Sequence, residues 1–390
     1  MDRPVCVMLV AGEASGDVLG AELARALKAR LGEGRVRFVG VGGPAMAAEG
    51  VESPFDIGQL SVFGLFEGVK AYPRVKARVA DTAALAGRER PDIAVLIDSW
   101  GFTLRVAQAL RAQDPKLPLV KYVAPQVWAS RPGRAKTLAK AVDQLLSINV
   151  LDAAYFEKEG LPTTFVGNPA LARDLGPLDP ARFRAFIDAP ADAQILMVLP
   201  GSRPAEIERL MPPFGETVRR LTADRPDLRV VIPAAGVVAE QVRAQAAGWP
   251  GKVVVFEDAR LKFDAMAAAD VALACSGTVS TELALAGCPM VVAYRFGELT
   301  YRLAKLIVRT RFGTLFNIAA GRYVAPEFIQ HDCTAENLTQ AVAERLDSPD
   351  LRRRQVEDQY AALVKMGRGG PNPAEAGAEV VARMLDQRRA

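Results

Sequence analysis

Short apolar runs alternate with amphipathic stretches along most of the chain. Leucines at positions 19, 23, 27 and 31 recur every fourth residue, which predicts an amphipathic helix, and residues 72–88 and 102–112 also read as helices. Runs typical of buried strands lie at residues 5–10, 36–41, 93–97, 119–123, 145–148, 195–199, 230–232, 253–256, 271–274 and 290–294. This alternation predicts an α/β fold with doubly wound parallel sheets.

The series of strands and helices runs twice, which indicates two domains. A chain of 390 residues is too long for a single core. The polar, proline-rich passage 171–193 separates the two series and reads as a linker. We expect an N-terminal domain at residues 1–172, a C-terminal domain at 173–365 and a final helical segment at 366–390. That segment is expected to pack on the N-terminal domain or to exchange between the subunits of a homodimer.

Composition excludes several classes of protein. The net charge of +4 is mild, and no dense Lys/Arg block with interleaved aromatic residues marks a nucleic-acid binder. The four cysteines lack the spacing of a zinc site or a disulfide framework, which favours a reducing, cytoplasmic location. The single histidine, His331, argues against a Ser–His–Asp hydrolase or a histidine metal centre. We expect neither a signal peptide nor a transmembrane segment.

The strongest candidate for a ligand site follows the apolar run at 271–274. The small residues Ser276, Gly277 and Thr278 form a turn that opens a helix, whose first N–H groups face outward at the positive end of the helix dipole. A phosphate fits there. Glu282, one turn into the helix, is placed to accept hydrogen bonds from a sugar attached to that phosphate. The alternative is that these residues only cap the helix and complement its dipole.

A second loop of this kind follows the run at 195–199. The amides of Gly201 and Ser202 are candidates for phosphate binding, and Arg203 is a candidate to neutralise a leaving diphosphate. A plain Pro/Gly turn with a surface arginine is the alternative. Later in the chain, Asn317 is placed for a contact with a base or a sugar. The basic helix expected at 301–309 is a second candidate for contact with anionic lipid, or a solvated face of a core helix.

Two candidate groups in the N-terminal domain follow its first and third strands. Glu13, Ser15 and Asp17 crowd the carboxyl end of the first strand, where ligands of α/β proteins bind, although the loop lacks GxGxxG. The alternative is that Ser15 caps a helix and Asp17 lies in its first turn. Asp98 ends the third strand, where it can act as a general base or cap the next helix.

An apolar patch lies between the second strand and the next helix. Its members are Leu60, Val62, Phe63, Leu65 and Phe66, and basic residues follow at positions 70, 74, 76 and 78. An apolar patch beside positive charge is typical of a surface that rests on anionic lipid. Packing in the core explains the same residues.

Seven short motifs and a single aspartate are spread in order over nearly the whole chain. They are AGEASGD at 11–17, GVGGPAM at 40–46, Asp98, YVAPQVWA at 122–129, LPGSR at 199–203, SGTVSTE at 276–282, PMVVAYR at 289–295 and NIAAGR at 317–322. Together they resemble the lipid-A-disaccharide synthase family of glycosyltransferases. The resemblance implies a GT-B fold of two Rossmann-like domains facing a cleft, and an inverting transfer that needs no metal or other cofactor.

The resemblance also implies substrates, location and residue roles. The expected donor is UDP-2,3-diacylglucosamine and the acceptor 2,3-diacylglucosamine 1-phosphate, joined at the cytoplasmic face of the inner membrane of a Gram-negative bacterium. Asp98 corresponds to the base, Glu13, Ser15 and Asp17 to the acceptor side, and the apolar patch to an acyl-chain contact. The residues implied for the UDP-sugar are Gly201, Ser202, Arg203, Ser276, Gly277, Thr278, Glu282, Arg295 and Asn317.

The chain departs from the family pattern in three places of the N-terminal domain. These are residues 99–101, 149–152 and Asn168, so an acceptor with altered acylation or an amino-substituted sugar is an open hypothesis. Two other functions fit the same scaffold: another UDP-sugar enzyme, such as a transferase with a different acceptor or a 2-epimerase, and a non-catalytic nucleotide- or lipid-binding protein.

Overall fold

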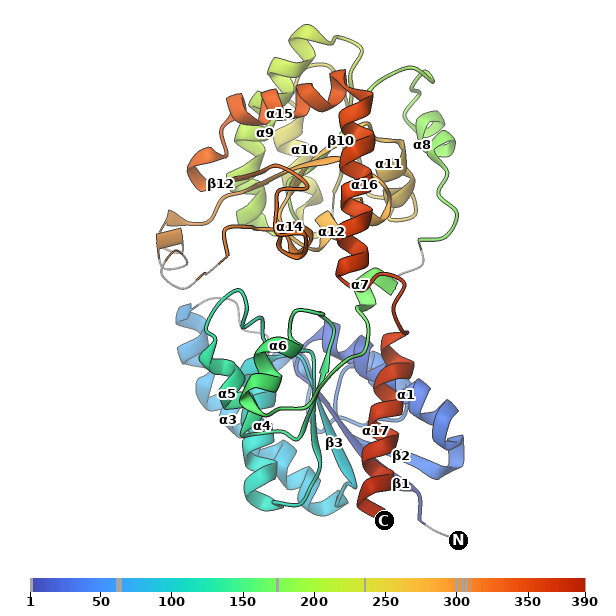
Figure 1. Ribbon diagram of the computed structural model, residues 1–390. Helices are drawn as coiled ribbons and strands as arrows, with labels where there is room; N and C mark the ends of the chain where they lie inside the picture. Colours follow the sequence, from blue (N-terminus) through green and yellow to red (C-terminus); the bar gives the residue numbers. More distant parts are fainter. Residues whose placement is uncertain are drawn as a thin grey trace. The chain divides into compact units, whose positions relative to one another are not determined.

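Two compact α/β units make up the chain in the computed structural model (Figure 1). The structure describes residues 3–60, 65–172, 175–234, 236–298, 301, 302, 305, 308 and 310–389, apart from the side chains of 65–71 and 389. Unit 1 consists of Met1–Ala172 and Gly369–Ala390, and unit 2 of Arg173–Arg368. Within the described residues, no helix has the length and apolar character needed to cross a bilayer.

Unit 1 is built on a six-stranded parallel sheet in the order β2-β1-β3-β4-β5-β6. Its strands are β1 (Val5–Ala11), β2 (Val36–Val41), β3 (Ile93–Ile97), β4 (Leu119–Tyr122), β5 (Gln144–Ser147) and β6 (Thr163–Phe165). Its helices are α1 (Ala14–Leu31), α2 (Pro44–Ala48), α3 (Leu65–Glu89), α4 (Trp100–Gln113), α5 (Gly133–Ala139), α6 (Ala153–Phe156), α7 (Pro169–Ala172) and α17 (Pro373–Arg389).

Helices cover both faces of the unit 1 sheet, because alternate residues of each strand point to opposite sides. Val7 and Leu9 of β1 pack with residues of α1 and α17, whereas Met8 and Val10 pack with residues of α4 and α5. Helix α17 lies alongside α1 of the same chain. Strands buried on both faces read as unbroken apolar runs, which explains why the sequence predicted β1 to β5 closely.

Unit 2 repeats this design with the sheet order β12-β11-β10-β7-β8-β9, again all parallel. Its strands are β7 (Ile195–Leu199), β8 (Arg229–Pro233), β9 (Lys252–Phe256), β10 (Val271–Cys275), β11 (Met290–Tyr294) and β12 (Glu327–Ile329). Its helices are α8 (Pro180–Phe186), α9 (Pro204–Asp224), α10 (Ala239–Ala246), α11 (Lys262–Ala268), α12 (Thr278–Leu285), α14 (Leu315–Ala320), α15 (Ala335–Asp347) and α16 (Pro349–Lys365).

Each sheet has one point at which the order of its strands reverses, and ligands of open α/β sheets bind beyond the carboxyl ends of the strands at such a point. In unit 1 the reversal lies between β1 and β3, and in unit 2 between β7 and β10. The loops that leave these four strands therefore frame the two places where a ligand is expected. These four loops contain most of the polar residues singled out in the sequence.

The observed sheets confirm the predicted α/β fold with two doubly wound halves. One local expectation needs correction: the passage 171–193, predicted to be a linker, contains helix α8. This helix is anchored to unit 2, because Asp264 of α11 accepts hydrogen bonds from the Asp179 amide at 2.8 Å and from the Arg182 Nε at 2.7 Å. The sequence did not predict this helix, because Asp264, the residue that holds it, lies about 80 residues further along the chain.

Candidate functional site

A cavity of about 610 Å³ lies at the reversal point of unit 2, beyond the carboxyl ends of β7 and β10. The structure brings together seven of the nine residues that the resemblance implied for the donor. The seven that line this cavity are Gly201, Ser202, Arg203, Ser276, Gly277, Thr278 and Glu282. Its volume is within the range of pockets that hold a small-molecule ligand.

The first residues of helix α12 line this cavity. Strand β10 ends at Cys275 and the helix begins at Thr278, so only Ser276 and Gly277 connect them. The Ser276 hydroxyl donates to the Gly313 carbonyl at 3.0 Å, which fixes one side of the turn. The first N–H groups of an α-helix have no carbonyl one turn earlier, so this helix start offers donors and a positive dipole end to an anion.

The loop after β7 is held by Glu206 of α9, a residue whose role the sequence did not reveal. Its carboxylate accepts from the Ser202 amide at 3.1 Å and from the Arg203 Nη1 atom at 3.0 Å. A Cβ atom on Gly201 would lie 2.4 Å from Glu206 Oε2, so only glycine leaves room for this contact. The Ser202 amide thus already has an acceptor, and Arg203, whose side chain is 73% exposed, is the loop's candidate for a phosphate.

Glu282 forms an ion pair with Lys262 of α11 inside the cavity. The Lys262 Nζ atom lies 2.5 Å from Glu282 Oε2, and the two side chains are 30% and 17% exposed. Both residues line the cavity. The pair places a positive charge close to the carboxylate that was predicted to accept from a sugar.

Other charges around the cavity are balanced as well. Glu257 and Asp258 line it, and they pair with Arg243 at 2.5 Å and Arg260 at 2.9 Å. The cavity carries no large excess of positive charge, because each of its lining cations, Arg203 and Lys262, has a carboxylate beside it. An anion bound there therefore depends on directed donors, above all the start of α12, more than on net charge.

Two of the residues implied for the donor, Arg295 and Asn317, are not among the residues that line the cavity. Asn317 is fully buried, and its side chain bonds Val324 N at 2.7 Å, Ala325 O at 2.9 Å and Glu327 Oε1 at 2.7 Å. These contacts give Asn317 a structural part. They also connect Asn317 to the cavity indirectly. Glu327 accepts from the Gly313 amide at 2.6 Å, and the Gly313 carbonyl accepts from the hydroxyl of Ser276, which lines the cavity.

Arg295 also bonds within the protein. Its guanidinium donates to the Cys333 carbonyl, and its Nε atom is buried without a hydrogen-bond partner among the described residues. A contact between Arg295 and the donor stays a prediction.

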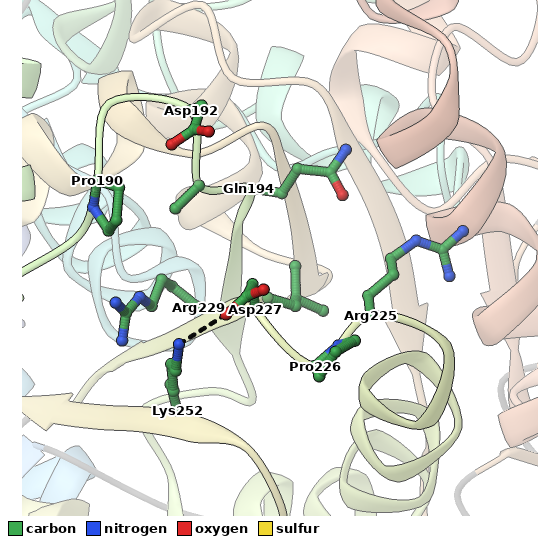
Figure 2. Close-up of a pocket in the computed structure, with 10 residues that line it drawn as sticks. Pro190, Asp192, Gln194, Arg225, Pro226, Asp227, Arg229 and Lys252 are labelled. Atoms are coloured by element: carbon green, nitrogen blue, oxygen red, sulfur yellow. Dashed lines mark hydrogen bonds and ion pairs between the residues drawn. The ribbon is translucent and has the colours of Figure 1, made fainter.

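A second cavity of about 520 Å³ lies at the opposite edge of the unit 2 sheet (Figure 2). Its lining includes Arg229 and Lys252, the first residues of β8 and β9, so it is at the amino ends of these strands. Figure 2 shows Lys252 paired with Asp227, at 2.8 Å. Ligands of open α/β sheets bind at the carboxyl edge, so the cavity at α12 is the better candidate.

In unit 1, Asp98 lies at the reversal point, directly after β3. Asp98 and Ser99 both have left-handed backbone conformations, with φ of 46° and 39°. The Asp98 amide donates to the Tyr122 carbonyl at 2.9 Å, which continues the pairing with β4. Strained residues of this kind persist where the surrounding structure holds them, often at functional sites.

The loop after β1 lies beside this turn. A Cβ atom on Gly12 would lie 2.7 Å from Ser99 Oγ, so the two loops touch at this glycine. Glu13 and Ser15 follow and are exposed. Asp17, in contrast, is buried, and its carboxylate accepts from the amides of Gly43, Ala45 and Met46 at 2.7 to 2.9 Å. These bonds give Asp17 a structural part at the start of α2.

Most of the apolar patch is beyond what the structure describes. Val62 and Phe63 lie outside the described residues, and Leu65 and Phe66 belong to α3 without described side chains. Leu60 is 8% exposed and packs in the core of unit 1 with Phe55, the alternative that the sequence left open. The basic helix expected at 301–309 is likewise described only at residues 301, 302, 305 and 308.

Sequence reasoning overlooked Lys121 and Thr103 beside Asp98. Lys121 lies inside β4 and is 2% exposed, and its ammonium donates to Thr103 Oγ1 at 2.8 Å. Burial lowers the pKa of Lys121 to about 7, against the opposing effect of the Asp98 and Glu13 carboxylates. The sequence did contain a signal for this residue, because a lysine inside the apolar run 119–123 is unusual and suggests a specific role.

Comparison with known proteins supports the family that the motifs indicate. The family model for lipid-A-disaccharide synthetase matches residues 7–374. A lipid-A-disaccharide synthase of Rhodospirillum centenum is 41% identical over 386 residues, which cover 99% of this chain and 96% of that protein. One of Paramagnetospirillum magneticum is 42% identical over 385 residues, or 98% of each chain.

Solved structures with low sequence identity show the same fold. A Neisseria meningitidis UDP-GlcNAc 2-epimerase bound to UDP-GlcNAc has a TM-score of 0.57 and 11% identity, over 98% of this chain and 100% of that one. MurG of Acinetobacter baumannii has a TM-score of 0.58 and 17% identity, with the same coverage. The fold is thus of the GT-B type, and the match over nearly the full length shows that this chain belongs to the lipid-A-disaccharide synthase family.

Proposed function

We propose that this chain transfers 2,3-diacylglucosamine from UDP to 2,3-diacylglucosamine 1-phosphate, giving lipid A disaccharide 1-phosphate and UDP. Family membership over residues 7–374 supports the reaction class. The observation that carries the assignment is the unit 2 cavity, where two family motifs meet at the start of α12. A nucleoside diphosphate suits such a site, since its charge can rest on helix amides.

The proposed chemistry is a single displacement with inversion. The primary hydroxyl oxygen of the acceptor attacks the anomeric carbon of the donor, and the bond between that carbon and the diphosphate oxygen breaks. Asp98 takes the hydroxyl proton, and UDP leaves with the bonding electrons. The amides at the start of α12 and Arg203 stabilise the charge that gathers on the diphosphate. The new linkage has the β configuration.

The ion pairs around the cavity are consistent with separate roles for Arg203 at the diphosphate and Glu282 at the sugar. Arg203 is largely exposed, so its guanidinium can turn towards a diphosphate while Glu206 keeps the loop in place through the Ser202 amide. Lys262 lines the cavity beside Glu282, where it partly neutralises the carboxylate next to an anionic ligand. We assign Glu282 to the sugar hydroxyls of the donor, because a carboxylate accepts their hydrogen bonds.

The acyl chains of both substrates lead us to place the enzyme at the cytoplasmic face of the inner membrane. The exposed residues Tyr72, Arg74 and Lys76 near the start of α3 support this location, because an aromatic ring with cations suits the headgroup region of anionic lipid. Sedimentation with vesicles of anionic lipid is the test. We expect Arg74→Glu with Lys76→Glu to abolish co-sedimentation. Equal binding to purely zwitterionic vesicles would contradict this location.

Product analysis by mass spectrometry tests the reaction. We expect the purified protein, given UDP-2,3-diacylglucosamine and 2,3-diacylglucosamine 1-phosphate, to form the disaccharide 1-phosphate and UDP without added metal. Asp98→Asn should remove turnover and leave UDP binding within about twofold. Turnover of UDP-GlcNAc without acyl chains would favour another UDP-sugar enzyme. UDP binding without product from any acylated donor would favour a non-catalytic protein.

A further inference from the structure

Lys121 is a buried cation in a strand whose other residues are apolar or aromatic. It occupies the third position of β4, and its side chain is on the same side of the sheet as Leu119, towards α4 and α5. Only 2% of its surface is exposed. Burying an ammonium is costly, so a lysine in the middle of a core strand needs specific partners.

The partners of Lys121 are the main chain at Asp98 and the side chain of Thr103. The ammonium donates to the Asp98 carbonyl oxygen and, at 2.8 Å, to Thr103 Oγ1. The same hydroxyl lies 2.6 Å from the Asp98 carbonyl oxygen and 3.0 Å from the Ser99 carbonyl oxygen. Lys121 and Thr103 thus bind both carbonyls of the turn that carries Asp98.

This turn needs such support. Asp98 and Ser99 have consecutive left-handed conformations, which residues other than glycine rarely adopt. The close approach of Gly12 to Ser99 leaves the turn little room on the side of the β1–α1 loop. The hydrogen bonds from β4 and α4 hold it on the other side.

The charges around Lys121 also point to Asp98. The titratable groups that act on it are the carboxylates of Asp98, after β3, and Glu13, after β1. Both come from the loops at the reversal point of unit 1, where the acceptor is expected. The buried ammonium thus lies within electrostatic reach of the carboxylate assigned as the base and of Glu13 on the acceptor side.

We propose that Lys121, together with Thr103, is a positioning residue for the transfer reaction. Their hydrogen bonds to the Asp98 and Ser99 carbonyls fix the left-handed turn, and with it the direction in which the Asp98 carboxylate is presented to the acceptor hydroxyl. The inference rests on the proposed role of Asp98 as the base. It concerns orientation of that base, so it affects kcat rather than donor binding.

A matched pair of variants at Thr103 separates the hydroxyl from packing. Thr103→Val keeps the shape and removes the hydroxyl, whereas Thr103→Ser keeps the hydroxyl and removes a methyl group. We expect Thr103→Val to lower kcat at least tenfold, with KM for the UDP-sugar and the Kd for UDP within about twofold, and Thr103→Ser to retain most of kcat. A Thr103→Val enzyme with wild-type kcat, or a Thr103→Ser enzyme equally impaired, would overturn the proposal.

Variants at Lys121 test the charge. We expect Lys121→Met to lower kcat more than Lys121→Gln, which keeps a hydrogen-bond donor. We also expect KM for the UDP-sugar and the Kd for UDP to stay within about twofold in both variants, because the change concerns the orientation of Asp98. A folded Lys121→Met enzyme with wild-type kcat would refute the role of Lys121.

The same assay distinguishes this inference from the proposed function. If Asp98→Asn keeps its activity, the assignment of the base fails. If Asp98→Asn is inactive while Lys121→Met and Thr103→Val turn over like the wild type, only the positioning role fails. Thermal unfolding of each variant, compared with the wild type, confirms that unit 1 is folded.

Discussion

Gly12 of the β1–α1 loop packs against Ser99 of the β3–α4 turn, so that a Cβ atom on Gly12 would lie 2.7 Å from Ser99 Oγ and 3.0 Å from Ser99 Cβ. A contact under 3.0 Å forces a neighbour to move, and the neighbour here belongs to the turn that carries Asp98. This close contact explains why position 12, in the loop where acceptor binding is proposed, is a glycine: a larger residue would collide with Ser99.

Gly12→Ala is therefore expected to displace the β3–α4 turn and to lower kcat about 10- to 100-fold, because small misplacement of a catalytic group is costly. UDP affinity should stay within about twofold, since the cavity proposed for UDP belongs to unit 2. Gly34→Ala is the control, because a Cβ atom there meets nothing within 4 Å. Steady-state kinetics and calorimetry measure both quantities. Equal kcat for the two variants would show that the contact between Gly12 and Ser99 does not matter for activity.

Removing the cation beside Glu282 should weaken donor binding. We expect Lys262→Met to reduce the affinity for UDP about tenfold, because the Glu282 carboxylate then repels the diphosphate without a neighbouring ammonium. Lys252→Met removes the same charge from the other edge of the sheet, where Lys252 pairs with Asp227 (Figure 2). Calorimetric titration should show nearly wild-type affinity for that control. Similar losses in both variants would mean that net charge alone governs binding.

Asn317→Ala is expected to destabilise unit 2 by about 2–4 kcal/mol, because it leaves the buried amides of Val324 and Ala325 without their acceptor. Asn337→Ala, which loses one exposed bond to the Asp332 carbonyl, should cost less than about 1 kcal/mol. Hydrogen–deuterium exchange of peptides from unit 2 compares the two. Unchanged exchange in Asn317→Ala would contradict the structural part assigned to this residue.

Asp152 gives unit 1 a pH-dependent stability. Burial raises its pKa to about 6, although Ser147 Oγ and Trp128 Nε1 donate to the carboxylate at 2.5 and 3.2 Å. Between its ordinary pKa and about 6 the folded protein holds a proton that the unfolded chain has released, so stability falls as the pH rises through this window.

Between pH 5 and pH 8, the titration of Asp152 alone should lower the free energy of unfolding of the wild type by about 1 kcal/mol. Asp152→Asn should remove that loss, whereas Asp386→Asn, at an exposed position of α17, should keep it. Thermal unfolding at both pH values provides the comparison. A variant at Asp152 with the same pH dependence as the wild type would rule out this source.

Buried parallel strands were the most predictable part of the fold. Strands β3, β7 and β11 have the bounds expected from the sequence, because strands covered on both faces are unbroken apolar runs. Strands β6 and β12 were missed. Each is an edge strand of only three residues, none of which is fully buried. Neither therefore shows a strong apolar pattern in the sequence.

The candidate site was predictable where its residues follow a strand directly. The turn after β10 and the loop after β7 meet because parallel strands end at one edge of a sheet. The partners of these residues were not predictable. Glu327 holds Asn317, and Lys121 holds the Asp98 turn, through contacts between separate elements that no local pattern records.

Capture of the UDP diphosphate by the amides at the start of α12 is the central claim, and the first residue of that helix allows a direct test. Proline is tolerated at this position and removes one N–H group, whereas valine keeps it, so Thr278→Pro and Thr278→Val differ chiefly in that donor. The measurement is calorimetric titration of UDP into the wild type and both variants. The wild type should bind UDP, with affinity at least tenfold lower for Thr278→Pro than for Thr278→Val. No binding by the wild type, or equal affinities for the two variants, would contradict the claim.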